Sequence, residues 1–383
     1  MAARKIAAHA IEIDDFVTAE HYVEQCDEEE VNIVDENGET LLHKAARKGN
    51  SQCIIKLVQK GADVTKVRTQ DSIFGYEATN ALLMALGDRC LCDADYSNPK
   101  INKLTSKAYA ALIHPSIVNW TGSSLFTPLH RAAKYGIIAA IQELVKAGAD
   151  PARESYFRCI PLEYFFHRVR DNECSNSEAI FPLIPQSAHM DPFVIVNYID
   201  AFDEHLTDPT HDAEVLARML LSTRPDDYFS LHLPTVMYTS DHYTKPELVL
   251  LLDAEHRMCY SVKFDLLYPI SVLLRKGLGA QTSPQSSPAL DVYRAEGEPY
   301  PGTSTVEESN VKYEEAAEKA KEIDALFAGP LSLFDQCCIT VRRSIQIPKH
   351  DNLPQLPLPP LVLEQVTLLS LCREFLERIH NNR

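Results

Sequence analysis

The sequence has little positive charge, no long apolar run and no cysteine pair with metal-site spacing, and each shortage excludes a class of protein. It holds 37 Lys and Arg residues against 54 Asp and Glu residues, a formal net charge of −17 over 383 residues. Nucleic acids and anionic membranes are recognised through a positive field, so neither is expected as the main partner. The longest apolar runs, such as residues 248–252, are too short to span a bilayer.

The chain start and the cysteines indicate a compartment in which thiols stay reduced. The opening MAARKIAAHAIEIDD reaches acidic residues before an apolar segment has formed, which is unlike a secretory signal. Ten cysteines are present, but the closest pairs, Cys90 with Cys92 and Cys337 with Cys338, lack the Cys-x-x-Cys spacing of zinc sites. We therefore expect no metal site, no disulfide framework, and a protein of the cytoplasm or the nucleus.

Motifs that carry catalysis are absent from the sequence. It contains no GxSxG, Walker loop, GxGxxG or HExxH. We therefore expect no catalytic residue, no cofactor and no enzymatic activity. The competing hypothesis of an enzyme would need a cluster of titratable groups in a cleft.

Two segments of the chain resemble each other closely. Residues 37–64 read NGETLLHKAARKGNSQCIIKLVQKGADV, and residues 124–151 read SLFTPLHRAAKYGIIAAIQELVKAGADP. In both segments a histidine lies 18 residues before the glycine of a Gly-Ala-Asp triplet. Such self-similarity predicts supersecondary units that stack on one another.

The second segment shows why each unit should be a pair of helices. Thr127 can cap the first helix with its hydroxyl, and Pro128 suits the first helical position, where its missing N–H costs nothing. Gly136 is expected to end that helix in a left-handed conformation. A second helix is expected over residues 138–147, with Gly148 as its stop.

The motif TPLHRAA in this segment resembles the signature of the ankyrin repeat. The resemblance implies an all-α ankyrin-repeat solenoid over residues 1–278 that binds a protein partner. It also implies that His43 and His130 are structural and hydrogen-bond between repeats. Tyr135 and Phe126 are expected to be exposed and available to that partner.

Weaker copies of the repeat are predicted from their phase. They are expected at residues 80–86, 160–166 and 268–277, with an insertion near residues 89–105. A half-formed capping repeat is expected at residues 10–32. Residues 185–260 have helical periodicity without a signature, and we interpret them as divergent repeats.

The composition changes after Gly277. Residues 279–310 are rich in Ser, Pro, Gly and Thr and are expected to form a flexible linker. Residues 311–329 are rich in Ala and Glu and are expected to form a charged connecting helix. Two short helical segments are expected to follow, at residues 330–370 and 371–383.

The first of these two segments contains a helix-spaced pattern of small and apolar residues, namely Ser332, Leu333, Cys337 and Val341. Positions i, i+4 and i+8 follow one helix face, with Ser332 placed as a cap and Leu333 as a knob for an apolar groove. The pattern resembles the elongin-binding half of a SOCS box. Phe334 and Ile339 are expected to pack elsewhere in the protein.

The sequence LPQLPLPP follows and resembles the cullin-binding half of a SOCS box. The matching residues are Leu353, Leu356, Pro357, Leu358 and Pro359. Prolines fix an extended strand that has little ordering entropy to lose on binding. In the family, Leu-Pro-Leu-Pro is associated with the fifth cullin, although the usual Tyr-Leu ending of this half is not clear here.

The leucine–cysteine spacing recurs near the end of the chain, at Thr367, Leu368, Cys372 and Leu376. No Leu-Pro-apolar-Pro sequence follows it, so we interpret this second match as the core face of a helix. An alternative for the whole tail is a helical cap that closes the repeat stack.

The resemblance implies a substrate-recognition adaptor of a cullin-RING E3 ubiquitin ligase. Its partners would be the elongin B/C heterodimer, a cullin with its RING protein, and a protein substrate that the sequence does not identify. The alternative is an ankyrin-repeat scaffold for protein interactions with no ligase link. Leu333, Cys337 and residues 356–359 are the features that separate the two hypotheses.

Overall fold

The computed structural model describes most of the repeat region and the chain end. The described residues are 2–72, 75–87, 104–121, 125–156, 159–170, 180–185, 194–195, 198–199, 209–223, 230–231, 248–252, 259–279, 281–282, 314, 318, 321–322, 325–326, 328–344 and 355–381. The chain divides into two compact units, Met1–Pro185 and Gln186–Arg383.

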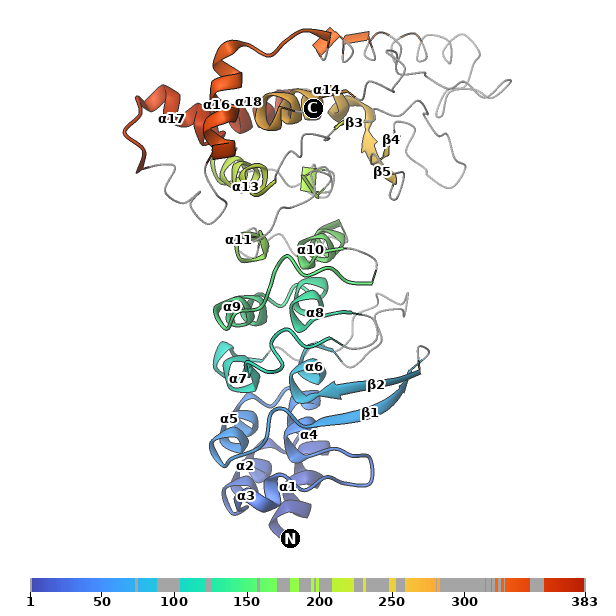
Figure 1. Ribbon diagram of the computed structural model, residues 1–383. Helices are drawn as coiled ribbons and strands as arrows, with labels where there is room; N and C mark the ends of the chain where they lie inside the picture. Colours follow the sequence, from blue (N-terminus) through green and yellow to red (C-terminus); the bar gives the residue numbers. More distant parts are fainter. Residues whose placement is uncertain are drawn as a thin grey trace, which may run out of the picture. The chain divides into compact units, whose positions relative to one another are not determined.

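The first unit is a stack of helix pairs in two rows (Figure 1). The first row is α1 (Ala2–Glu12), α4 (Leu41–Lys48), α6 (Ala81–Ala85), α8 (Pro128–Lys134) and α10 (Pro161–Arg170). The second row is α2 (Phe16–Glu24), α5 (Ser51–Gln59), α7 (Ser106–Leu112), α9 (Ile138–Lys146) and α11 (Ile180–Leu183). The short α3 (Glu28–Val31) follows α2. Neighbouring helices within each row are in contact, which confirms the ankyrin-repeat solenoid and its mainly helical fold.

The helix ends of the two clear repeats follow the same chemistry. The hydroxyl of Thr127 accepts a hydrogen bond from the backbone N–H of His130 at 3.3 Å, and the Thr127 N–H donates to Nδ1 of His130 at 3.2 Å. Thr40 and His43 form the same capping box at the start of α4. Gly136 has a φ of 62°, so it takes the left-handed conformation expected after the first helix.

Asparagine side chains tie successive units together, a feature that the repeat pattern does not reveal. Asn32 donates to the carbonyl of Gly61 at 2.8 Å and accepts from the N–H of Asp63 at 2.8 Å. Asn119, two helix pairs further along the chain, makes the same two bonds: it donates to the carbonyl of Gly148 at 3.0 Å and accepts from the N–H of Asp150 at 2.8 Å. Each amide therefore satisfies the turn that ends the next second-row helix.

The N-terminal end of the stack is more complete than the sequence indicates. A half-formed repeat is expected at residues 10–32, but α1 begins at Ala2 and pairs fully with α2. Asp15 and Asp27 cap α2 and α3 with their side chains. The acidic run that opens α3 therefore lies at a helix N-terminus, where negative charge is favourable.

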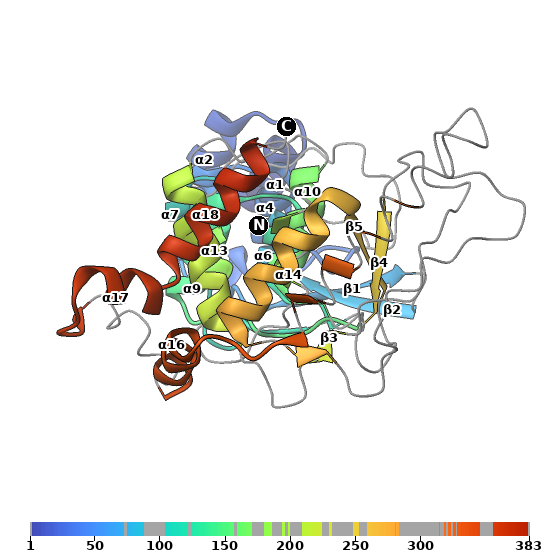
Figure 2. The same cartoon turned by 90° about the horizontal axis from the view of Figure 1, so that it is seen from above.

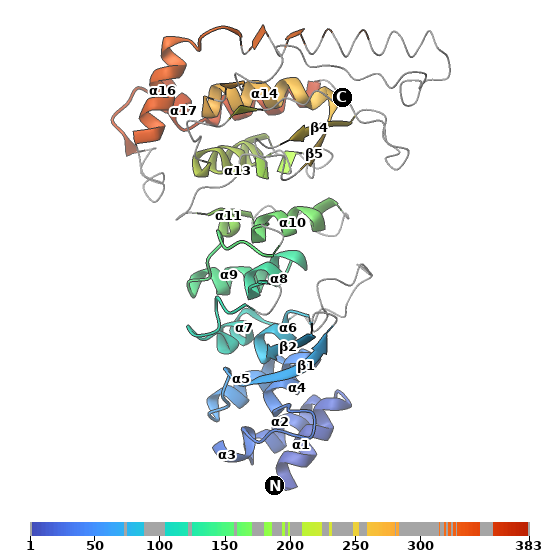
Figure 3. The ribbon, with the colours of Figure 1, turned by 45° about the vertical axis from the view of Figure 1, so that its right-hand side comes forward.

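A β-hairpin interrupts the helical stack between α5 and α6. Strand β1 (Val67–Ser72) pairs antiparallel with β2 (Gly75–Asn80), from Val67 opposite Asn80 to Ser72 opposite Gly75. The hairpin lies on the side of the first-row helices (Figures 1 and 3). The predicted insertion falls between α6 and α7, and its residues 89–103 lie outside the described part of the chain.

The second unit is built around three long helices, α13 (Pro209–Ser222), α14 (Phe264–Leu278) and α18 (Leu369–Asn381). Helix α18 contacts both others, and the three lie side by side in Figure 2. The predicted helical tail is thus a central part of this core. Two short sheets accompany it, namely β4 (Leu248–Leu252) with β5 (Cys259–Lys263), and β3 (Ser230–Leu231) with β6 (Gln281–Thr282).

The weaker repeat copy predicted at residues 268–277 lies within helix α14. Helix α14 begins at Phe264, directly after β5, so Pro269 lies inside it and removes one backbone donor. Gly277 does not end the helix. A Cβ atom there would lie 3.6 Å from both Leu220 and Leu371, an ordinary van der Waals distance, so this position lies where α14 packs against α13 and α18.

Candidate partner-binding site

Helix α16 (Leu333–Ser344) carries the predicted elongin-binding pattern, and its start is capped as expected. The Ser332 hydroxyl accepts from the backbone N–H of Asp335 at 3.0 Å and donates to that residue's carboxylate at 2.6 Å. Ser332 thus satisfies a first-turn donor that the helix cannot. The Asp335 carboxylate also lies where the helix dipole favours negative charge.

One face of α16 is open and apolar. The Leu333 side chain is 76% exposed, Val341 is 36% exposed, and Cys337 between them is also exposed. The three residues are four positions apart, so they follow a single stripe along the helix. Phe334 is 48% exposed and widens the stripe, so the expectation that it packs elsewhere is wrong.

The opposite face of α16 is buried against the second unit. Cys338, Ile339 and Arg342 are all buried, as expected for Ile339. Burial raises the pKa of the Cys338 thiol, so Cys338 behaves as a small apolar side chain rather than a nucleophile. One face of α16 therefore holds the helix on the rest of the second unit, and the opposite face stays exposed.

The predicted cullin-binding residues only partly share that openness. Leu356 and Leu358 are half-buried and pack with Leu221 and Val362 on a small cluster formed by Cys338 and Val366. Pro357 and Pro359 are exposed, immediately before α17 (Pro360–Val366). Leu353 lies outside the described residues.

Leu361, on the first turn of α17, extends the exposed part of this segment. It is 80% exposed, and the Leu-Pro-apolar-Pro pattern does not include it. Its position directly after two prolines is the only signal that the sequence offered. Pro357, Pro359 and Leu361 are therefore among the open side chains of this half.

The residues of the second leucine–cysteine match are buried, as predicted. Its four members, Thr367, Leu368, Cys372 and Leu376, are all buried. Burial raises the pKa of the Cys372 thiol strongly, so it stays protonated. Of the two matches, only the one on α16 presents a leucine to a partner.

Among the described residues of the repeat stack, large apolar side chains are exposed at two places. These are the segments that connect one helix pair to the next and the N-terminal helix pair. Those between pairs are Ile33, Val34, Val67, Leu125 and Tyr156. The expectation for Phe126 is wrong, because it is buried edge-on against the rings of His130 and Tyr164, with centroids 5.5 and 4.9 Å away. Tyr135 is half-buried.

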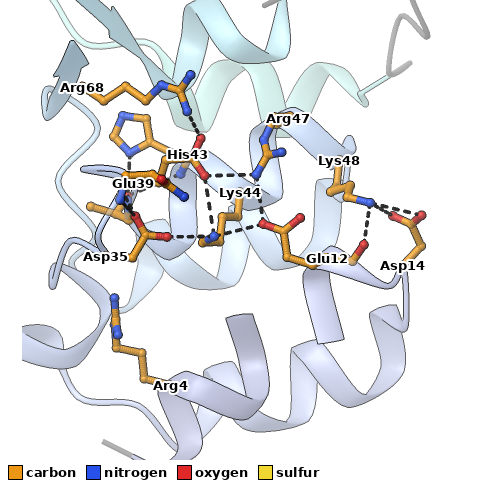
Figure 4. A network of polar contacts seen from close by, with 12 residues as sticks. Arg4, Glu12, Asp14, Asp35, Glu39, His43, Lys44, Arg47, Lys48 and Arg68 are labelled. Atoms are coloured by element: carbon orange, nitrogen blue, oxygen red, sulfur yellow. Dashed lines mark hydrogen bonds and ion pairs between the residues drawn. The ribbon is translucent and has the colours of Figure 1, made fainter. Parts of the chain in front are cut away.

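A charged network holds the base of the β1–β2 hairpin (Figure 4). The Glu39 side chain is 2% exposed and pairs with Arg47 at 3.0 Å, with Lys44 at 3.6 Å and with Arg68 of β1. Lys44 and Arg47 also reach Glu12 at 3.0 and 2.9 Å. Burial alone would raise the pKa of Glu12, but the hydrogen bond from Lys44 and the charge of Arg47 outweigh it and lower the pKa.

The buried histidines are structural in their geometry. Burial lowers the pKa of both His43 and His130, that of His130 to about 4, so both rings are uncharged near neutral pH. The Nε2 atom of His130 lies 3.1 Å from the carbonyl of Cys159, which precedes α10, so this ring bridges two repeats as expected.

The described residues offer neither a metal site nor a membrane span. They contain no group of three or more His, Cys, Asp or Glu side chains that could hold a metal ion. Among the described helices, none has the length and apolar character needed to cross a membrane.

Family comparisons match both parts of the chain. The family model of the ankyrin repeat matches residues 37–69 and 124–155. The family model of the SOCS box matches residues 329–364, which contain α16 and the exposed prolines before α17.

Proposed function

This chain is an ankyrin-repeat and SOCS-box protein, and we propose that it is a substrate-recognition subunit of a cullin-RING ubiquitin ligase. The combination fits a substrate-receptor adaptor of such ligases in general. In the specific form that we propose, the repeats bind a protein substrate, and the SOCS box binds elongin B/C and a cullin.

The open stripe of α16 carries this proposal. Leu333, Cys337 and Val341 present apolar surface on one face of a helix whose other face is already buried. A helix that lays an apolar stripe into a groove is a recurring mode of recognition, and a few anchor side chains carry most of the binding energy. We assign this stripe to elongin, with Ser332 fixing the start of the helix.

For the cullin we propose the segment from Leu353 to Pro359, and the Leu-Pro-Leu-Pro sequence favours the fifth type. Pro357 and Pro359 are the exposed members of this set. Leu356 and Leu358 pack toward Cys338, so they would act by fixing the prolines in place. Leu361 adds exposed apolar surface next to them.

The substrate would bind the segments between helix pairs of the repeat stack. These segments carry Val34, Val67, Leu125 and Tyr156, which are exposed, while the facing helices bury their apolar residues. Exposed aromatic and aliphatic side chains at the rim of a rigid scaffold are typical of protein-binding surfaces. The receptor itself would perform no bond chemistry, and it would act in the cytoplasm or the nucleus.

The alternative is a repeat scaffold without a ligase link, in which the tail only closes the stack. The burial of α18 against α13 and α14 fits a closing role for that helix. The exposure of Leu333 on α16 does not, because a closing helix has no reason to leave its leucine open.

Co-purification with recombinant elongin B/C tests the proposal. Leu333→Arg places a charge at the most exposed large apolar residue of the stripe and should weaken binding by about a hundredfold or more. Val17→Arg is a matched control, because Val17 is an equally open apolar side chain in the first unit. Equal retention of elongin B/C by Leu333→Arg and by the control would refute the assigned site.

A further inference from the structure

Helix α16 needs more than its own sequence to stay in place. It has 12 residues, and helices of this length are marginal in isolation. Among its described side chains, a narrow stripe of Cys338, Ile339 and Arg342 is buried against the rest of the second unit. Arg342 differs from the other two because it is charged, and a buried cation is tolerated only when it is hydrogen-bonded.

Arg342 joins two helices through backbone carbonyls. Its Nε atom donates to the carbonyl of Cys338, one turn earlier in α16, at 3.1 Å. One of its terminal nitrogens donates to the carbonyl of Lys276 at 3.3 Å. Lys276 lies in the last turn of α14, where carbonyls lack helical partners and carry partial negative charge. The guanidinium therefore caps α14 from a position on α16.

A second arginine makes the reverse connection. Arg275, next to Lys276 on α14, is buried and donates to the carbonyl of Gly329, shortly before α16. Burial lowers the pKa of Arg275, although an arginine keeps its charge at any working pH. Each segment thus supplies an arginine to a carbonyl of the other. Hydrogen bonds from a charged donor are roughly twice as strong as neutral ones.

We propose that Arg342 and Arg275 form a reciprocal clamp that holds the SOCS-box helix on the end of α14 and presents its open stripe already ordered. The clamp lies on the face of α16 opposite Leu333 and Cys337, so it can remain closed while a partner occupies the stripe. A helix that is ordered before binding loses less conformational entropy when it docks. This role for Arg342 and Arg275 rests on the proposed function only where it concerns elongin.

Hydrogen exchange on the full chain tests the clamp without any partner. Arg342→Met keeps the aliphatic stem and removes the donors, so amides of α16 should exchange about tenfold faster, while those of α13 and α18 should not change. Arg378→Met is the matched control, since Arg378 is an exposed arginine on α18 that pairs with Glu374 one turn away. Exchange in α16 equal to that of the control would overturn the clamp.

A second variant and a binding measurement separate the clamp from a general loss of stability. If Arg342→Met unfolds the second unit, Arg275→Met takes its place, and its amides in α16 should again exchange faster than those in α13 and α18. Faster exchange spread evenly over α13, α14 and α18 in both variants would also overturn the proposal. Where the effect is local, the affinity for elongin B/C should fall about threefold to tenfold. A wild-type chain that fails to bind elongin B/C would refute the proposed function, while the exchange result would still decide the clamp.

Discussion

The helix pair α8–α9 and the helix pair α14–α18 are both buried, yet they are specified in different ways. Helix α8 begins at a threonine cap and ends at a left-handed glycine within one short segment, and α9 follows at once. Helix α14 is also followed by a left-handed glycine, Gly279, but it meets α18 only after about ninety intervening residues. The first pair therefore depends on local chemistry, and the second depends on contacts that form only in the folded chain.

The largest expected effect comes from charging the core of the second unit. Cys372 lies buried on α18, and Cys372→Asp should cost about 4 kcal/mol of folding free energy there, because a fully buried carboxylate loses its hydration. Hydrogen exchange should show lost protection in α13, α14 and α18 and retained protection in α4, α5, α8 and α9.

Cys337→Asp is the control for that experiment. It makes the same chemical change at an exposed position on α16 and should leave the stability of both units unchanged. Equal protection of α18 in the two variants would contradict the contrast between the closed and the open cysteine.

The next effect concerns the charged network around Glu39, which joins residues that are distant in the sequence. Glu39→Gln should cost about 3 kcal/mol, because it leaves Arg47 and Arg68 beside a buried amide instead of a carboxylate. Glu143→Gln, which breaks a pair with the exposed Lys146, should cost less than about 1 kcal/mol. Urea unfolding of both variants measures the difference, and equal costs would show that Glu39 is not the centre of the network.

A smaller effect follows from the histidine that links two repeats. Burial lowers the folded-state pKa of His130 from 6.5 to about 4, so the unfolded chain binds a proton more readily between these values. Stability from this group is therefore complete above about pH 6.5 and is lost as the pH falls toward 4.

Between pH 7.5 and pH 5 the loss should be about 2 kcal/mol. Urea unfolding of the wild type and of His130→Gln at both pH values isolates it from the contribution of the carboxylates. The variant should be less stable at pH 7.5 and should lose less on acidification. Parallel losses in the two proteins would show that His130 does not titrate as its burial requires.

The repeat units were predictable because their signals are local. Thr127, Pro128, Gly136 and Gly148 each suit one backbone position, and the structure places the helix ends there. The bridging amides of Asn32 and Asn119 were missed, because their partners lie about thirty residues further along the chain. The β1–β2 hairpin was missed because the repeat pattern contains no signal for a long strand pair.

The candidate site was predictable in its spacing but not in its surroundings. The intervals between Leu333, Cys337 and Val341 predicted a single helix face, and these residues do lie on one. Sequence could not tell that Phe334 is exposed, because its burial depends on how α16 rests on α14. Arg342 gave no signal, since its partner is a carbonyl 66 residues earlier in the chain.

The alkylation rate of Cys337, measured by mass spectrometry with and without elongin B/C, tests the central claim most directly. Cys337 lies at the middle of the open stripe, whereas Cys338 and Cys372 are buried and serve as internal references. The account predicts rapid alkylation of Cys337 in the free chain and strong protection once elongin B/C is bound. A complex in which Cys337 reacts as fast as it does in the free chain would contradict it.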